Sequence, residues 1–384
     1  MNTISNILKN EELRQSTVIN LIPSENVVSD NVLKALGSVF TNKYAEGYAH
    51  HRYYAGNQCV DELKDTVIDL VYKAFNVNKE EYGVNVQTYS GSSANFATYF
   101  GVLDIGDKVL SMSLSHGGHL THGHTASVTN KLFTFKHYGV NIDGVLDYDN
   151  IRALAKEFRP KLIIAGTSAY PRTLDFKMFK EIADEVGALL MTDIAHIAGL
   201  VVGGVHPSPL PYADIVTMTT HKTLRGPRGA IIISKKLLSE NINKAVFPGL
   251  QGGPHMNAIA AIGVALEEAT TPQFKEYAIQ VVKNAKMLAK ELKNAGFTLI
   301  ANGTDNHLML IDVSKIGLTG QQASEMLEKV GIIVNKNAIP YDLRKPWDPS
   351  GIRIGTPVVT SQGMLETEMI TIAKRIAKTL LKSF

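Results

Sequence analysis

The stretch Thr217-Met218-Thr219-Thr220-His221-Lys222-Thr223-Leu224-Arg225-Gly226-Pro227-Arg228-Gly229 contains a single lysine, which follows an apolar run directly. The run at 215–218 predicts a buried strand, and the glycine and proline further on predict a turn. A lysine held near other cations and away from bulk water loses its proton more easily, and its neutral amine can attack a carbonyl carbon. Lys222 is therefore the candidate nucleophile, although a solvated loop lysine is the plain alternative.

Six further apolar runs accompany this one and predict strands. They lie at 84–87, 108–111, 131–135, 162–165, 189–192 and 230–233. Helical patterns separate several of them, for example from Val60 to Ala74, at 149–158 and at 176–186. Short apolar strands separated by helices are typical of a mostly parallel sheet with helices on both faces, which binds ligands beyond the carboxyl ends of its strands. The predicted fold class is α/β.

The chain is predicted to have three parts. Residues 1–40 combine a short polar helix with an extended segment, and we expect this arm to pack on a partner subunit. Residues 41–270 form the large domain, and residues 271–384 form a smaller C-terminal α/β domain. The polar, aromatic segment 41–57 shows no secondary-structure pattern, and loops of this length usually carry function.

Composition excludes several classes of protein. The chain has 384 residues, of which 45% are hydrophobic, and its 39 basic and 36 acidic residues are interleaved. This balance gives no signal for nucleic acid or a membrane surface, and no run of eighteen apolar residues is present. The single cysteine, Cys59, rules out an intramolecular disulfide, as in a reducing compartment. We expect a cytoplasmic protein.

Two loops after predicted strands suggest a bound cofactor. Ser90, Gly91 and Ser92 stand at a strand-to-helix junction, where backbone NH groups and the helix dipole can hold a phosphate, although such residues also simply cap helices. Residues 114–124 contain four histidines. Imidazoles suit a metal ion, but three glycines and the absence of an adjacent carboxylate also fit a histidine stacked on a flat cofactor.

Two charged residues extend this pattern. Asp193 ends a predicted buried strand and would pair well with a protonated pyridine nitrogen, although it could merely cap the next segment. Arg353 lies in a short predicted strand of the second domain and suits a carboxylate clamp, with a structural salt bridge as its alternative. A phosphate cup, a stacking histidine, a strand-end aspartate and Lys222 together fit a Schiff-base cofactor on a parallel sheet.

With these motifs, the chain resembles the serine hydroxymethyltransferase family over nearly its whole length. The matching stretches are 41–48, 52–54, 90–92, 116–123, 193–196, 219–224, 247–249, 251–254, 303–308, 334–337 and 351–357. The resemblance implies a fold-type I pyridoxal-phosphate enzyme that converts serine and tetrahydrofolate into glycine and 5,10-methylenetetrahydrofolate. It also implies a homodimer with shared sites, possibly a tetramer, and no metal ion.

The resemblance also implies roles for single residues. Lys222 would bind the cofactor covalently, Asp193 would meet its ring nitrogen and His119 would stack on its ring. The other cofactor contacts would be Ser90, Gly91, Ser92, Ser168, His196, Tyr44 and, from the neighbouring subunit, Gly253. Arg353, Ser24, Glu46 and Tyr54 would bind the substrate. Tyr44, Glu46 and Tyr54 would come from the partner, with Glu46 as the main acid-base candidate beside Tyr54, Lys222 and His221. Leu114, Gly118, Leu120 and Asn337 would line the folate pocket.

The chain departs from the family pattern at a few positions. Ala49 and His50 stand where proline and glycine are usual, Ser93 replaces glutamine or proline, and Ser361-Gln362 replaces a common Thr-Arg pair. A folate-independent threonine aldolase or transaldolase on the same scaffold, a non-catalytic scaffold protein and a histidine-cluster metal hydrolase are the competing hypotheses. Glu46, Tyr54 and Asn337 favour the transferase.

Overall fold

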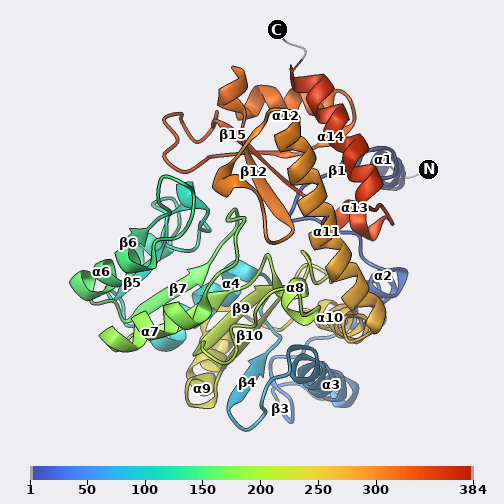
Figure 1. The fold of residues 1–384 in the computed structure, drawn as a ribbon. Coiled ribbons are helices and arrows are strands. Elements are labelled where there is room, and N and C mark those ends of the chain that lie inside the picture. The colour runs from blue at the N-terminus through green and yellow to red at the C-terminus, as the bar shows by residue number, and fades with distance from the viewer. Residues whose placement is uncertain (1–2, 382–384) are drawn as a thin grey trace.

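A seven-stranded sheet forms the centre of the larger part of the molecule (Figure 1). The structure is a computed structural model that describes residues 3–381. The strand order is β4-β10-β9-β8-β7-β5-β6, and only β10 runs antiparallel to its neighbours. The strands are β4 (Tyr82–Asn85), β5 (Lys108–Met112), β6 (Thr134–Tyr138), β7 (Leu162–Gly166), β8 (Leu189–Asp193), β9 (Ile215–Thr219) and β10 (Ala230–Lys235). The predicted α/β class with a mostly parallel sheet is confirmed.

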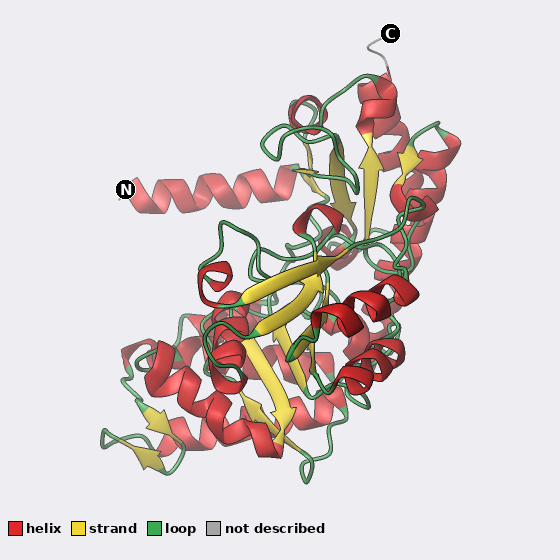
Figure 2. Cartoon of the chain, turned by 90° about the vertical axis from the view of Figure 1, so that its left-hand side faces the viewer, coloured by secondary structure: helices red, strands yellow, loops and turns green. Residues whose placement is uncertain are grey.

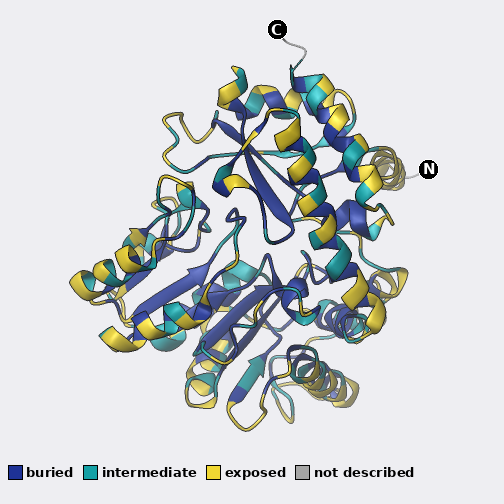
Figure 3. Cartoon of the chain, in the orientation of Figure 1, coloured by how far each residue is buried: buried dark blue, intermediate teal, exposed yellow. Residues whose placement is uncertain are grey.

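Helices cover both faces of this sheet because its strands bury side chains on both sides. In β7, Leu162 and Ile164 join the core on one face, whereas Ile163 and Ala165 join the core on the other. The first face carries α4 (Gly91–Val102) and α9 (Lys236–Lys244). The second carries α3 (Gln58–Phe75), α6 (Tyr148–Phe158), α7 (Phe176–Val186) and α10 (Met256–Ala269). Figure 3 shows the buried sheet between helices whose outer faces are exposed.

A second, antiparallel sheet has a core of its own. Its order is β11-β12-β15-β14, with β11 (Thr298–Leu299), β12 (Leu308–Asp312), β14 (Asn335–Asn337) and β15 (Gly351–Gly355). The helices α11 (Pro272–Asn294), α12 (Gly320–Glu328) and α14 (Glu366–Leu380) pack on it. Helix α11 links the two cores, because Val281 lies in the first and Leu288 in the second. Its start is well defined, since Thr271 caps it and a proline occupies its first turn.

The first part of the chain lies on the surface. Helix α1 (Thr3–Thr17) has no buried residue and projects from the rest of the molecule in Figure 2. It leads into β1 (Ile19–Asn20), which pairs with β13 (Ile332–Ile333), and α2 (Asp30–Leu36) packs on α10 through Val32. Ile7, Leu8 and Leu13 are 56–64% exposed. Helix α1 therefore presents apolar side chains that the described part of this chain does not cover.

Three predicted elements differ from the structure. Residues 131–132 belong to the short helix α5 (Thr129–Leu132), so the strand predicted at 131–135 begins only at Thr134. The strand predicted at 84–87 ends at Asn85, because the Asn85 side chain accepts a bond from the Gln87 amide (2.8 Å) and turns the chain. Segment 41–57 contains the end of a 3₁₀ turn (Val39–Asn42) and a small hairpin of β2 (Gly47–Tyr48) and β3 (His51–Arg52).

The remaining elements are short. They are the helices α8 (Ala198–Val202) and α13 (Pro357–Ser361), the 3₁₀ turns η2 (Leu114–His116), η4 (Ile300–Asn302) and η5 (Val313–Ile316), and the π-type turn η3 (Ala245–Leu250). Within residues 3–381, no helix is long and apolar enough to cross a membrane.

Candidate active site

Lys222 lies just beyond the carboxyl end of β9. Its Nζ donates a hydrogen bond to Thr219 Oγ1 (3.0 Å), and Asn26 Nδ2 donates to its backbone carbonyl (2.8 Å). The chain turns sharply after it, because Gly226 N bonds back to Thr220 O (2.7 Å). The lysine is thus held by both its side chain and its backbone.

The surroundings of Lys222 make its amine more reactive. Burial lowers its pKa to about 8, and the positive charges of Arg353 and Arg228 act in the same direction. Asp193 opposes them. Near neutral pH, a useful fraction of Lys222 is therefore an uncharged nucleophile.

Asp193 is a buried carboxylate at the end of β8 with several hydrogen-bond donors. Its Oδ2 accepts from Asn95 Nδ2 (2.9 Å) and lies 3.0 Å from His122 Nε2, while its Oδ1 accepts from the Ala195 amide (3.0 Å). Burial opposes its charge, but His122, His119 and Asn95 outweigh burial and hold the pKa of Asp193 well below its usual range. Asp193 therefore stays ionised and can face a cationic ring nitrogen.

Asn95 and His122 belong to this site, although the sequence did not predict either of them there. Asn95 comes from α4, and it also donates to Thr121 Oγ1 (2.9 Å) and accepts from Thr217 Oγ1 (2.8 Å). Its amide thus links α4, the histidine loop and β9 to Asp193. The only local signal was a polar residue among small apolar ones in a buried helix.

His119 lies in the same site, because Asp193, Lys222 and Arg353 all affect its charge. Burial lowers the pKa of His119 to about 4, so its ring is neutral at working pH. Its Nδ1 lies 2.8 Å from Thr121 Oγ1, which fixes the plane of the ring. A neutral imidazole with a fixed plane suits stacking on a flat cofactor.

His196 follows β8 and contacts the second sheet. Its Nδ1 lies 3.2 Å from His307 Nε2, and the two rings stack 5.4 Å apart. Burial and nearby cations keep the pKa of His196 well below its usual value, and burial lowers that of His307 to about 3. His307 is a third residue of this site that the sequence did not single out. Two neutral imidazoles therefore join the sheets beside Lys222.

Arg353 reaches from β15 towards the large sheet. Its Nη1 donates to the carbonyl of Ser168 (2.5 Å) and its Nε to Asn335 Oδ1 (3.1 Å). Burial lowers its pKa to about 10, so it remains charged. Among residues 3–381, no carboxylate lies within salt-bridge distance of its guanidinium. A partly buried cation of this kind suits the carboxylate of a substrate.

The predicted phosphate cup opens α4. Ser90 is the N-cap, and its Oγ accepts from the Ser93 amide (3.3 Å). Gly91 packs closely on β9, since a Cβ at this position would lie 2.7 Å from Thr219 Cγ2. Ser92 follows in the first turn, so the three residues stand at the positive end of a 12-residue helix, beside the hydroxyl that contacts Lys222.

Ser24 and His221 line one hollow of about 400 Å³ together with Arg228. His221 Nε2 lies 3.2 Å from Arg228 Nη1, and burial lowers the pKa of His221 to about 3. His221 therefore cannot act as a cationic acid near neutral pH. Ser24, a predicted substrate residue, therefore lies beside the loop that carries Lys222.

Tyr44, Glu46, Tyr54 and Gly253 form a separate group, here called the Glu46 cluster. Tyr44 Oη donates to Glu46 Oε1 (3.3 Å), and the rings of Tyr44 and Tyr54 meet edge to face at 5.0 Å. A Cβ at Gly253 would lie 3.5 Å from the Tyr44 ring. Tyr44 and Tyr54 are 56% and 47% exposed. The two tyrosine rings of this cluster are therefore largely open to solvent.

The predicted folate residues come from two segments of the chain. Leu114, Gly118 and Leu120 lie between β5 and α5, and Asn337 lies in β14. The first segment contacts the loop that follows β14, because the rings of His116 and Tyr341 meet at 4.8 Å. Tyr341 Oη also donates to the Val140 carbonyl (2.5 Å), and the Val140 amide donates to His116 Nδ1 (3.0 Å). Leu120 is 49% exposed and open to a ligand.

The four histidines of residues 114–124 have different partners. His116 contacts Val140, His119 contacts Thr121, His122 contacts Asp193, and His124 accepts from a backbone amide. In the described part of the chain, no three His, Cys, Asp or Glu side chains are grouped to hold a metal ion.

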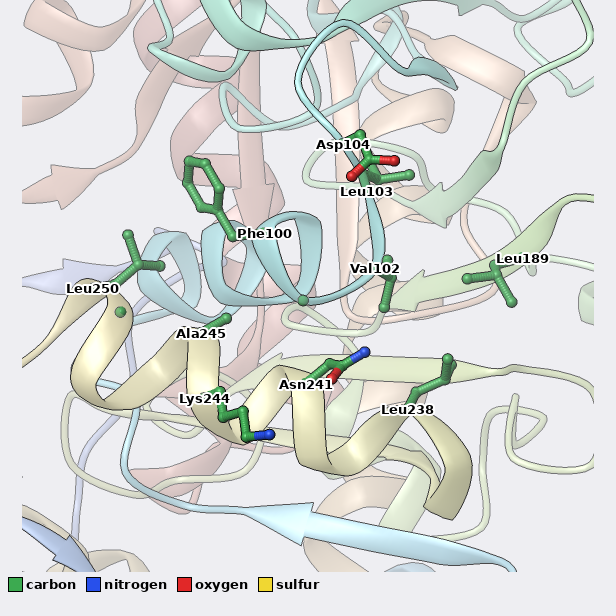
Figure 4. Close-up of a pocket in the computed structure, with 12 residues that line it drawn as sticks. Phe100, Val102, Leu103, Asp104, Leu189, Leu238, Asn241, Lys244, Ala245 and Leu250 are labelled. Carbon is green, nitrogen blue, oxygen red and sulfur yellow. The ribbon is translucent and has the colours of Figure 1, made fainter.

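A hollow of about 840 Å³ lies away from these residues (Figure 4). It is bounded by the last turns of α4 and by α9, and Phe100, Leu238 and Leu250 give it an apolar lining. The predicted site residues on α4 stand at the opposite end of that helix. This hollow is therefore separate from the Lys222 site.

Comparison with known proteins identifies the family of this chain. Residues 2–376 match the family model described as serine hydroxymethyltransferase. A serine hydroxymethyltransferase of Desulfotalea psychrophila is 55% identical over 367 residues, covering 96% of this chain and 85% of the relative. That of Methanosarcina barkeri is 54% identical over 378 residues, covering 98% of this chain and 91% of the relative. The chain belongs to the serine hydroxymethyltransferase family.

Proposed function

We propose that this protein transfers the hydroxymethyl carbon of serine to tetrahydrofolate, giving glycine and 5,10-methylenetetrahydrofolate, and catalyses the reverse reaction. The observation that carries the proposal is the arrangement around Lys222: a buried amine with a lowered pKa, an ionised Asp193 and an Arg353 without a carboxylate partner among residues 3–381. The family match, above 50% identity in both relatives, does not favour an aldolase or a scaffold protein.

The residues present fit pyridoxal phosphate, the cofactor of this family. Lys222 would hold its aldehyde carbon, Asp193 its ring nitrogen, His119 its ring face, and Ser90, Gly91 and Ser92 its phosphate. Ser168 and His196 would flank its phenolic oxygen. When bound, the cofactor supplies an electron sink that stabilises negative charge at the substrate Cα.

The chain's own residues bind and orient the substrate. Arg353 would hold the serine carboxylate through two parallel hydrogen bonds, with Ser24 as a further donor. Holding the carboxylate in one place orients the substrate relative to the cofactor ring. This orientation selects the bond that breaks, and it is the main contribution of these binding residues. Thr219 Oγ1 holds the Lys222 amine at the carboxyl end of β9, where it would meet the cofactor. Glu46 would hold and move the proton of the substrate hydroxyl, with Tyr54 beside it.

We also propose that the enzyme is at least a homodimer whose partner supplies Tyr44, Glu46, Tyr54 and Gly253 to each Lys222 site. The outward exposure of the Glu46 cluster supports this proposal, as does helix α1, whose apolar side chains are exposed. We further propose that the protein is cytoplasmic. We also propose that it divides into an arm (1–40), a large domain (41–270) and a small domain (271–384). Leu114, Gly118, Leu120 and Asn337 would line the folate pocket.

One assay tests the function. Serine cleavage should depend on tetrahydrofolate, and the purified protein should absorb in the visible region as a yellow pyridoxal-phosphate protein. Cleavage that does not respond to tetrahydrofolate would favour the aldolase, and a colourless, inactive protein would favour the scaffold. Activity abolished by a chelator, with bound zinc, would favour a metal hydrolase.

A further inference from the structure

Arg52 contacts the backbone on both sides of Glu46. Its Nη1 donates to the carbonyl of Ala45 (2.7 Å) and to that of Gly47 (3.0 Å), which are the two residues next to Glu46 in the chain. The Arg52 side chain is only 4% exposed. One buried guanidinium nitrogen therefore holds the peptide group that precedes Glu46 and the peptide group that follows Gly47.

The backbone of Glu46 is fixed from a second direction by the same hairpin. Its carbonyl accepts from the Tyr53 amide (3.2 Å), which extends the pairing of β2 and β3 by one residue pair. Gly47 makes this close pairing possible, because its φ is 98° and a Cβ there would lie 2.3 Å from the His51 carbonyl. With the backbone held in this way, the carboxylate is the part of Glu46 that remains free to meet a ligand.

Asp61 of helix α3 orients Arg52. Its Oδ1 accepts from Arg52 Nε (2.8 Å), and its Oδ2 accepts from the His50 amide (3.0 Å). Burial opposes the charge of Asp61, but the bonds from Arg52 and His50 outweigh it and lower its pKa. The His50 ring adds a contact to Asp65 (2.9 Å), so helix α3 holds the hairpin at two points. The ion pair between Arg52 and Asp61 is only slightly exposed, so it is weakly screened by solvent.

We propose that Asp61 and Arg52 form a positioning pair that sets the Glu46 carboxylate for proton transfer in the partner's site. This inference rests on the proposed role of Glu46. Arg52 and Asp61 touch neither substrate nor cofactor in the proposal, and they act only through the backbone of residues 45–47. A displacement of about 1 Å in a catalytic group can lower a rate about 100-fold.

The test uses the full-length, cofactor-bound enzyme with Arg52→Lys and, separately, Asp61→Asn. Lysine keeps the charge but cannot reproduce the planar fork that reaches one carboxylate and two carbonyls. Each variant should lower kcat for serine cleavage by about 10-fold or more, while serine KM and the visible absorbance stay within twofold of the wild type. Asp69→Asn is the matched control, since Asp69 lies on the same helix in an exposed ion pair with Lys79, and its kcat should not change.

A double-mutant cycle with Glu46→Gln separates positioning from a general structural role. If Arg52 acts through Glu46, Arg52→Lys should cause little further loss of kcat in the Glu46→Gln background. A full additional loss in that background would overturn the proposal, because Arg52 would then act independently of Glu46.

The same variants distinguish this inference from the proposed function. Wild-type kcat in both Arg52→Lys and Asp61→Asn, with a large loss in Glu46→Gln, would overturn the positioning role and leave the function intact. Wild-type kcat in Glu46→Gln would overturn the assignment of Glu46 and the positioning role with it. If one substitution prevents folding, as judged by circular dichroism, the other carries the test, since it perturbs the opposite partner of the same bond.

Discussion

Replacing Lys222 by methionine should stabilise the cofactor-free protein. Lys222 is a partly buried cation whose amine donates a hydrogen bond to Thr219 Oγ1. Burial and two nearby arginines lower its pKa from 10.5 to about 8, so protonated Lys222 is less stable in the folded than in the unfolded chain. Methionine has a similar length and carries no charge to desolvate.

The expected gain in stability follows from the shift in the pKa of Lys222. Between pH 8 and 10.5 the unfolded chain binds a proton at this lysine that the folded chain does not, so stability rises with pH in that window. Integrated over pH, the lowered pKa reduces the free energy of unfolding of the wild type by about 3 kcal/mol at pH 7. Methionine loses the bond to Thr219, worth about 1 kcal/mol, which leaves a net gain of about 2 kcal/mol at pH 7. The gain should nearly vanish by about pH 9.5, where much of the penalty has gone.

The assay is urea unfolding of both cofactor-free proteins at one protein concentration, at pH 7 and pH 9.5. Comparing the two proteins at each pH cancels the titration of all other groups. Lys374→Met, at an exposed lysine of α14, is the control and should change stability by less than about 0.5 kcal/mol. A Lys222→Met protein that is no more stable than the wild type at pH 7, or a gain that does not shrink at pH 9.5, would refute the reasoning.

Three further outcomes are expected. Arg353→Lys should raise serine KM by about 10- to 100-fold at unchanged visible absorbance, because lysine cannot bind a carboxylate through a planar fork; an unchanged KM would remove Arg353 from the substrate site. Asn95→Ala should destabilise the cofactor-free protein by about 2–4 kcal/mol in urea unfolding, since it leaves Asp193 and two buried hydroxyls short of a partner; a loss below about 1 kcal/mol would contradict this. Tyr341→Phe should raise the KM for tetrahydrofolate about fivefold and leave that for serine unchanged, because it loses the bond to the Val140 carbonyl; equal changes in both would contradict a role specific to the folate side.

The features that sequence predicts well here are those encoded by local pattern. Apolar runs locate the strands because the sheet is buried on both faces. Asp193 directly follows one of those runs, and Lys222 lies a few residues after another. The strand predicted at 131–135 is partly wrong because a short apolar run does not distinguish a helical turn from a strand. In the structure, Asn130 Nδ2 bonds to the Gly123 carbonyl (2.9 Å), a contact that holds this helical turn against the histidine loop.

The features that sequence predicts poorly depend on packing between distant segments. Asn95 and Asp193 are 98 positions apart, and they meet only because α4 crosses the end of β8. The pairing of His196 with His307 likewise requires the second sheet to dock on the first. Apart from its place in a family motif, nothing in the sequence indicates the role of Arg52. Its hydrogen-bond acceptors are backbone carbonyls, which every residue possesses, so the residue types do not reveal them.

Borohydride reduction tests whether the cofactor is bound covalently at Lys222. The cofactor-bound protein would be reduced, digested and mapped by mass spectrometry. Lys64 is the informative competitor, because it is a second buried lysine whose pKa burial lowers, to about 7. We predict a phosphopyridoxyl group on the Lys222 peptide and on no other. A label on Lys64 or another lysine, or no label on a yellow protein, would contradict the account.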